Sequence, residues 1–195
     1  MKDSIMFKKI SVLLLIIVLI SGCAVHYPIS TDVKAIKKMS FSFDQPLYYK
    51  ISKPDFLTIG GPEKVEDVLK SQNYFGSVER VFDDTIPHKG FYVSIRPEWR
   101  PPTLPAIAFG YISASTATIL PAWTTKDGYD LYFDLYLDGR KVKTFNYRIK
   151  RVAGVWIVLL PFVWVNLLTN SEEDAFEAAT YQFFLDASKK MNTDI

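Results

Sequence analysis

Hydrophobic and polar residues alternate most regularly between residues 129 and 150, around the pair Asp138-Gly139. This alternation predicts a β-hairpin. A two-residue turn at Asp138-Gly139 would place the apolar residues of the first strand opposite polar residues of the second. A three-residue loop, 137–139, with Gly139 left-handed in a bulge, instead sets Leu131 opposite Phe145. Because a buried face determines strand register, we prefer the bulged hairpin.

Two other segments have helical spacing. Residues 62–72 start at Pro62, which suits a first helical position, and repeat apolar residues on one face. Residues 172–190 follow Ser171, which with Asp174 resembles a capping box, and they carry an apolar stripe that includes Phe176 and Phe183. Shorter alternating runs predict strands within 41–51, at 78–82 and at 91–96, the last ending at Pro97.

Together these elements predict the fold class. We expect an α+β protein with a single domain, in which a mainly antiparallel β-sheet packs against a short N-terminal helix and a C-terminal amphipathic helix. The many aromatic residues, 14 Phe, 11 Tyr and 4 Trp, favour half-buried strands.

Two long stretches carry no charge, between Arg100 and Lys126 and between Arg151 and Glu172. In the first, residues 111–120 are small and β-branched, which predicts a strand. In the second, residues 155–168 are apolar enough to raise the question of membrane insertion.

Three interpretations of residues 155–168 stay open. The favoured one is a buried strand, 155–160, followed by a turn at Pro161. The second is a membrane span with Trp156 and Trp164 as interfacial anchors, although Pro161 and Asn166 interrupt it. The third is an exposed apolar patch that dips into the bilayer or binds a membrane-protein partner.

The N-terminus has the three parts of a secretory signal. Basic residues precede the apolar run Ile10–Ile20, and small residues precede Cys23, the only cysteine. The run has 11 residues, too few for a spanning helix, which needs about 20. The segment Ile20-Ser21-Gly22-Cys23 resembles the lipobox of bacterial lipoproteins.

That resemblance implies a processed and lipidated chain. Cys23 would carry a diacylglycerol thioether, the peptide would be cut before it, and its new amine would be acylated by a chain such as palmitate. Ala24, rather than Asp, after the cysteine implies an outer membrane and a domain that faces the periplasm. The expected organisation is a cleaved signal peptide at 1–22, a lipidated tether at 23–39 and an α+β domain at 40–195.

Processing also changes the charge. Without residues 1–22, the 23 basic and 21 acidic residues each become 20, so the formal net charge falls from +2 to 0. A neutral chain gives no electrostatic case for nucleic acid as a partner. With Cys23 lipidated, no thiol remains for a disulfide or for cysteine chemistry.

The sequence contains few candidates for catalytic or metal-binding residues. We predict no catalytic residue, no metal site and no cofactor. His26 and His88 have no ligand-type neighbours at metal-binding spacing. The acidic clusters Asp83-Asp84 and Glu172-Glu173-Asp174 suit solvated or helix-capping positions better than a paired-carboxylate site. An aromatic platform for glycans would draw on the tyrosines at positions 129, 132, 136 and 147.

The predicted function is therefore that of an envelope lipoprotein, not an enzyme. We expect a membrane attachment through the lipid on Cys23, and a structural or interaction role in envelope assembly or maintenance. A lipid- or glycan-binding module is the alternative, and an envelope hydrolase is the third candidate.

Overall fold

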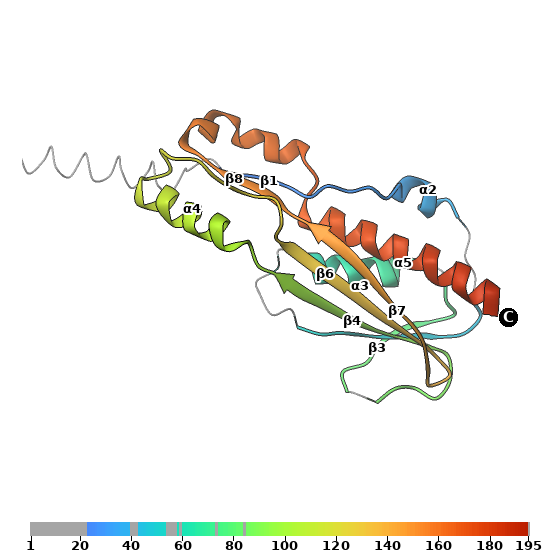
Figure 1. The fold of residues 1–195 in the computed structure, drawn as a ribbon. Helices are drawn as coiled ribbons and strands as arrows, with labels where there is room; N and C mark the ends of the chain where they lie inside the picture. Colours follow the sequence, from blue (N-terminus) through green and yellow to red (C-terminus); the bar gives the residue numbers. More distant parts are fainter. Residues whose placement is uncertain are drawn as a thin grey trace, which may run out of the picture. The chain divides into compact units, whose positions relative to one another are not determined.

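The computed structural model describes residues 23–39, 43–53, 58, 60–72, 74–83 and 85–194. The predicted signal peptide, 1–22, lies outside these residues, as do Phe41 and Asp84. The described residues form two compact units. Unit 1 contains residues 23–26, 101–127 and 151–170, and unit 2 contains the rest. The predicted α+β class is confirmed (Figure 1).

Unit 2 is a five-stranded sheet with helices on one face (Figure 1). The strands are β2 Leu47–Ile51, β3 Val78–Arg80, β4 Phe91–Arg100, β6 Gly128–Leu137 and β7 Arg140–Lys150. The helices are α2 Val33–Lys37, α3 Gly61–Ser71 and α5 Glu172–Asp194. In the strand order β3-β2-β4-β6-β7, β6 is antiparallel to both neighbours and β2 is parallel to both of its neighbours.

The core of unit 2 lies between the sheet and α5. Phe183 stacks on Phe133 of β6 with ring centroids 4.5 Å apart, and Phe176 meets Tyr129 edge-on at 5.3 Å. The predicted capping box is present at the start of α5. The amide of Asp174 donates to Ser171 Oγ at 3.1 Å, and the amide of Ser171 donates to Asp174 Oδ2 at 2.8 Å. Both predicted helices are thus confirmed, α3 beginning one residue before Pro62.

The hairpin β6–β7 differs from the prediction in its turn. Leu137 pairs with Arg140, so the turn has the two residues Asp138 and Gly139, both with positive φ. The extra residue instead enters β7 next to Leu135 and Tyr136, where the register shifts. The three-residue loop is therefore wrong, and Leu131 faces Tyr147 rather than Phe145. The bulge in β7 has the same effect on side-chain orientation as the predicted loop, because it places the apolar residues of both strands on one face.

Strand β4 also runs further than predicted, through Pro97 to Arg100. A central strand forms hydrogen bonds with a neighbouring strand on each side, and proline has no N–H to donate to either. The carbonyl of Ile95 accepts a hydrogen bond from Ser52 at 2.9 Å, beyond the last paired residue of β2. Pro97, two residues later, points to the same side, where β2 has already ended. The missing N–H therefore costs no ladder hydrogen bond.

Unit 1 holds a three-stranded antiparallel sheet with the order β1-β8-β5. Its strands are β1 Cys23–His26, β5 Ala122–Thr124 and β8 Val152–Val155, and its helices are α4 Leu104–Ser115 and the 3₁₀ segment η1 Ile157–Leu168. No helix of the described part of the chain is long and apolar enough to cross a membrane.

Both predictions for the uncharged stretches are corrected in unit 1. Residues 111–120, expected as a strand, contain the end of α4 followed by a turn with positive φ at Ala117 and Thr118. β-branched residues favour strands, but Thr116 Oγ1 donates back to the carbonyl of Ile112 at 3.0 Å, which such residues do at helix ends. The expected strand 155–160 ends at Val155, and η1 follows.

The segment 23–39, expected as a tether, is ordered in both units. Its first four residues form β1, and Val33–Lys37 form α2. Tyr27 and Ile36 are buried, and Lys37 Nζ lies 2.5 Å from Glu177 Oε1 of α5. A free tether would bury neither side chain, so this expectation is wrong for the described residues.

Glu66 ties α3 to the sheet and makes unit 2 sensitive to acid. Its carboxylate accepts hydrogen bonds from Lys70 at 2.6 Å, from the Tyr49 hydroxyl at 3.0 Å and from Arg80 at 2.7 Å. The Lys70 hydrogen bond, helped by Tyr49 and Arg80 and opposed by burial, holds the pKa of Glu66 below its usual range. A lowered folded pKa stabilises the fold above the unfolded pKa, near 4.5, and this stabilisation is lost as the pH falls.

We therefore expect Glu66→Gln to weaken the acid sensitivity of unit 2. The variant should be less stable than the original chain at about pH 7 and should lose less stability on going to about pH 3. Urea unfolding followed by circular dichroism at both pH values measures this. Glu63→Gln, an exposed change on the same helix, is the control. Equal losses in Glu66→Gln and the original chain would contradict the assigned role.

Candidate functional site

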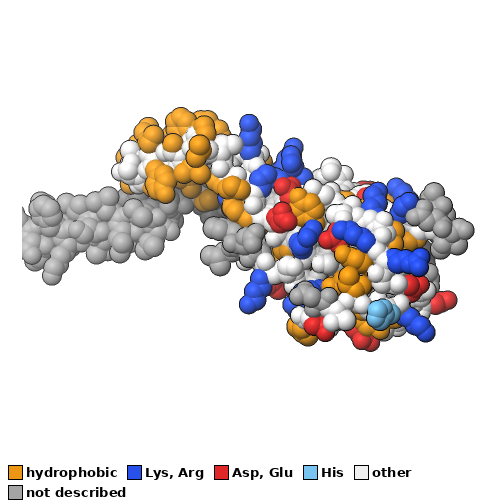
Figure 2. All heavy atoms as spheres, turned by 60° about the horizontal axis from the view of Figure 1, so that its bottom comes forward, with side chains coloured by type: hydrophobic (Ala, Val, Ile, Leu, Met, Phe, Trp, Pro, Cys, Tyr) orange, Lys and Arg blue, Asp and Glu red, His pale blue; other side chains and the backbone are white. Residues whose placement is uncertain are grey.

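Exposed hydrophobic side chains concentrate in unit 1. Fifteen of the 17 exposed large hydrophobic residues in the described part of the chain belong to it. We call these fifteen the apolar surface: Leu104, Ile107, Phe109, Tyr111, Ile112, Ile119, Leu120, Trp123, Val152, Trp156, Val158, Phe162, Trp164, Leu167 and Leu168. Figure 2 shows hydrophobic side chains gathered on the visible face of this unit. The favoured interpretation of residues 155–160 as a buried strand is therefore wrong, since Trp156 and Val158 are exposed.

Helix α4 is apolar around its whole circumference. Leu104, Ile107, Phe109 and Ile112 are all exposed, yet at 100° per residue they point in different directions. Pro105 lies in the first turn, where its missing N–H costs nothing. A helix with no polar face is typical of a protein core or a membrane, and α4 is not in a core.

The polar side chain of η1 is used inside unit 1. Asn166 Nδ2 donates to the carbonyl of Cys23 at 2.6 Å, and Asn166 Oδ1 accepts the amide of Val25 at 2.9 Å. Thr169 Oγ1 donates to the carbonyl of Val25 at 2.9 Å. These three bonds satisfy the outer edge of β1, which is otherwise an open sheet edge. In the sequence, Asn166 was an argument against membrane insertion. In the structure its side chain bonds to the backbone of β1.

Unit 1 contains a buried ion pair, Asp127–Arg151, that the sequence did not reveal. Asp127 has no exposed surface and accepts hydrogen bonds from Thr124 Oγ1 at 2.9 Å and from Arg151 Nε at 2.8 Å. The amide of Arg151 also donates to the carbonyl of Asp127 at 3.0 Å. The sequence offered one indication of this pair, namely the positions of the two residues. Arg151 borders the second uncharged stretch, and Asp127 follows the end of the first.

Cys23, the predicted lipidation residue, is exposed at the start of β1. It lines a groove of about 330 Å³ together with α4, β5 and β8, including Ala106, Ile107 and Trp123. Burial raises the pKa of the Cys23 thiol, and the Arg151 guanidinium opposes this effect. A raised pKa disfavours the thiolate form of the sulfur.

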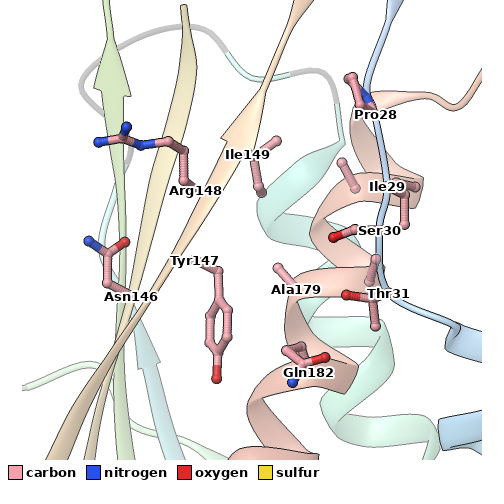
Figure 3. Close-up of a pocket in the computed structure, with 12 residues that line it drawn as sticks. Pro28, Ile29, Ser30, Thr31, Asn146, Tyr147, Arg148, Ile149, Ala179 and Gln182 are labelled. Carbon is pink, nitrogen blue, oxygen red and sulfur yellow. The ribbon is translucent and has the colours of Figure 1, made fainter.

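A second cavity, of about 290 Å³, lies in unit 2 between residues 28–31, β7 and α5 (Figure 3). Tyr147 and Ile149 point toward α5, whereas Asn146 and Arg148 point to the other side of the strand (Figure 3). The Tyr147 hydroxyl donates to Asp186 Oδ2 at 3.0 Å. Burial, followed by the negative charge of Asp186, raises the pKa of Tyr147 well above its usual range. The hydroxyl therefore stays protonated and structural.

The other candidate residues do not converge on a reactive site. Within the described residues, no group of three or more His, Cys, Asp or Glu side chains is placed to hold a metal ion. Glu172 is buried and accepts the Tyr27 hydroxyl at 3.2 Å, and Asp174 caps α5. His26 lies in β1 of unit 1 and His88 in a loop of unit 2.

The four tyrosines proposed as a glycan platform are divided between the two faces of the sheet. Tyr129 packs against Trp99 and Phe176 in the core, and Tyr147 is bonded to Asp186. Tyr132 and Tyr136 alternate with Leu131 and Phe133 along β6 and lie on the opposite side of the sheet from the helices. Arg96 and Lys141 lie over their rings, at 5.7 Å and 6.0 Å from the centroids.

Comparisons with known proteins do not identify a family. No protein-family model matches the sequence, and no curated protein matches it. Among solved structures, the chain is similar to a PelC dodecamer from Paraburkholderia phytofirmans, with 10% identity over 76% of this chain and 99% of that chain. The TM-score is 0.27. A likeness at that level supports no statement about the function of this chain.

Proposed function

We propose that this protein is a lipid-anchored lipoprotein of the cell envelope, held in the outer membrane and facing the periplasm, with a non-enzymatic structural or interaction role in envelope assembly or maintenance. One observation carries the proposal. Cys23, which ends the lipobox-like segment Ile20-Ser21-Gly22-Cys23, is exposed and belongs to the unit that bears the apolar surface. An exposed cysteine at the start of β1 can carry acyl chains while β1 stays folded.

The polar groups of the described residues support a non-enzymatic role. Asp127, Glu172 and Asp174 accept hydrogen bonds that hold the fold together. The Cys23 thiol and the Tyr147 hydroxyl both have raised pKa values, so neither is poised to act as a base or nucleophile.

A lipid-binding module is the second candidate. The groove of about 330 Å³ beside Cys23 is lined by Ala106, Ile107, Val155 and other small or apolar residues, which suits an acyl chain. The groove distinguishes this candidate from a glycan module, because the four tyrosines proposed for that module lie on two opposite faces of the sheet. Co-purification of a free fatty acid or phospholipid with a Cys23→Ser chain would favour this function over a purely structural one.

Metabolic labelling tests the proposed function. We expect cells that make the full chain to incorporate a palmitate analogue into it, and mass spectrometry to find the mature N-terminus at an acylated Cys23. Cys23→Ser should lose the label completely, because no other thiol is present. Gly22→Ala keeps a small residue before the cut and is the matched control that should remain labelled. Unchanged labelling of Cys23→Ser would refute the proposal, and so would a mature chain that still contains residues 1–22.

A further inference from the structure

We infer that the apolar surface of unit 1 inserts into the acyl-chain region of a lipid bilayer, forming a second membrane attachment beside Cys23. This inference deepens the proposed function, since it concerns the membrane that the lipid on Cys23 would enter. The occupant of the apolar surface is lipid, not a second copy of the chain or a partner protein. Charge, hydrogen bonding and the tryptophans each support this.

Charge is excluded from almost all of unit 1. Among its described residues only Lys126, Asp127 and Arg151 are formally charged. All three lie within two residues of a point where the chain crosses between the units, and Asp127 is fully buried against Arg151. A water-exposed unit has no reason to exclude charge from residues 101–125 and 152–170. A unit in lipid does, because each charged side chain is costly there.

Several polar side chains of unit 1 form their hydrogen bonds within the unit. Ser115 Oγ and Thr116 Oγ1 both donate to the carbonyl of Ile112, at 2.9 Å and 3.0 Å. The indole N–H of Trp156 donates to the carbonyl of Ile119 at 3.0 Å. Asn166 and Thr169 complete the outer edge of β1. Lipid provides no hydrogen-bond partners, so a lipid-exposed segment must bond its polar groups within the protein.

Three buried polar atoms of unit 1 are exceptions. His26 Nδ1, Ser113 Oγ and Thr118 Oγ1 have no hydrogen-bond partner among the described residues, but all three atoms are buried and none of these residues belongs to the apolar surface. A protein interface normally surrounds its apolar centre with a polar rim that bonds to the partner. The apolar surface leaves few such groups to offer, which favours lipid over a protein partner.

The tryptophans and the helix lengths indicate a shallow insertion. Three of the four tryptophans, Trp123, Trp156 and Trp164, are exposed on the apolar surface, and such rings favour the boundary between headgroups and acyl chains. Helix α4 has 12 residues and is therefore about 18 Å long. It is too short to span a bilayer of about 30 Å, so the unit enters one leaflet.

Vesicle binding by the processed chain, residues 23–195 with Cys23→Ser, tests the inference. This chain contains every described residue and neither the signal peptide nor a lipid. We expect it to float with protein-free vesicles of phosphatidylethanolamine and phosphatidylglycerol. Its tryptophan emission should shift to the blue, and lipids brominated on their acyl chains should quench it. Trp99→Phe removes the one tryptophan of unit 2 from the signal.

A matched pair of substitutions locates the contact. Leu167 is 86% exposed on the apolar surface, and Phe82 is 80% exposed in unit 2. Leu167→Asp should lower vesicle partitioning by roughly tenfold or more, because aspartate is strongly disfavoured in acyl chains. Phe82→Asp should leave partitioning unchanged. Both side chains are exposed, so circular dichroism should be the same for both variants.

Several results would overturn the inference. These are failure of the Cys23→Ser chain to bind, equal binding by Leu167→Asp, and binding only to vesicles that retain native membrane proteins. A blue shift that needs no vesicles and disappears in Leu167→Asp would indicate a second copy as the occupant. The brominated-lipid measurement needs no surface variant, so it decides the question even if Leu167→Asp misfolds. Loss of lipid from Cys23 in cells would refute the proposed function alone, and loss of vesicle binding would refute this inference alone.

Discussion

Replacing Phe183 with alanine is expected to lower the free energy of unfolding of unit 2 by about 3–5 kcal/mol. Phe183 is 2% exposed, stacks on Phe133 at 4.5 Å and meets Phe145 edge-on at 5.5 Å. Its ring therefore joins α5 to both strands of the hairpin. Truncation removes these contacts and leaves a cavity between helix and sheet that neither element can close alone. Urea unfolding followed by far-ultraviolet circular dichroism measures the loss.

Phe82→Ala is the matched control, since it makes the same chemical change at an exposed ring. We expect it to change the stability by less than about 0.5 kcal/mol. Its one described ring contact is with the guanidinium of Arg80, 5.1 Å from the centroid, at the surface. Similar losses in the two variants would mean that Phe183 is not a core residue of unit 2.

Arg151→Met is expected to lower the free energy of unfolding of unit 1 by about 3 kcal/mol. The change removes the guanidinium that pairs with the carboxylate of Asp127, which has no exposed surface. The Thr124 hydroxyl, which donates a hydrogen bond to Asp127 at 2.9 Å, carries no charge and would not replace the ion pair. Three of the four tryptophans lie in unit 1, so unfolding followed by tryptophan fluorescence reports on this unit.

Two further variants separate the buried charge from general effects. Arg148→Met removes an arginine that lies 3.4 Å from Asp130 and is 65% exposed, so it should cost less than about 1 kcal/mol. Adding Asp127→Asn to Arg151→Met should recover part of the loss, because a neutral amide is cheaper to bury than a carboxylate. If the double variant were no more stable than Arg151→Met, loss of the ion pair with Asp127 would not be the cause.

Local patterns predicted the elements of unit 2 well. The stripe with Phe176 and Phe183 and the Ser171–Asp174 cap predicted α5, and both are present because they act within one helix. The hairpin shows the limit of such patterns. Burial requires that Leu131 and Phe145 lie on the same face, but it allows either a longer turn or a bulge. The choice between them depends on neighbouring elements. The amide of Asp138 donates to the carbonyl of Gly90, and its carboxylate accepts the amide of Gly90, at 3.0 Å and 2.9 Å.

Unit 1 was harder to predict, because its sequence lacks the contrast on which pattern analysis depends. Around α4 apolar residues occur on every side, so no amphipathic period distinguishes a helix from a strand. The small and β-branched residues 111–120 favoured a strand, and back-bonding of Ser115 and Thr116 to Ile112 outweighed that preference. The Asp127–Arg151 pair joins residues 24 positions apart, which no local pattern detects.

The sequence by itself determined the α+β class, the two main helices, the single cysteine in its lipobox-like context and the absence of charge from two long stretches. Each is either local or a matter of composition. Only the tertiary structure decided that these two stretches, with residues 23–26, form one unit, and that their hydrophobic side chains are exposed rather than buried. Hydrophobicity measures how strongly a residue avoids water, and does not say whether protein or lipid takes the place of water. That depends on what packs against each side chain, which is a property of the folded chain.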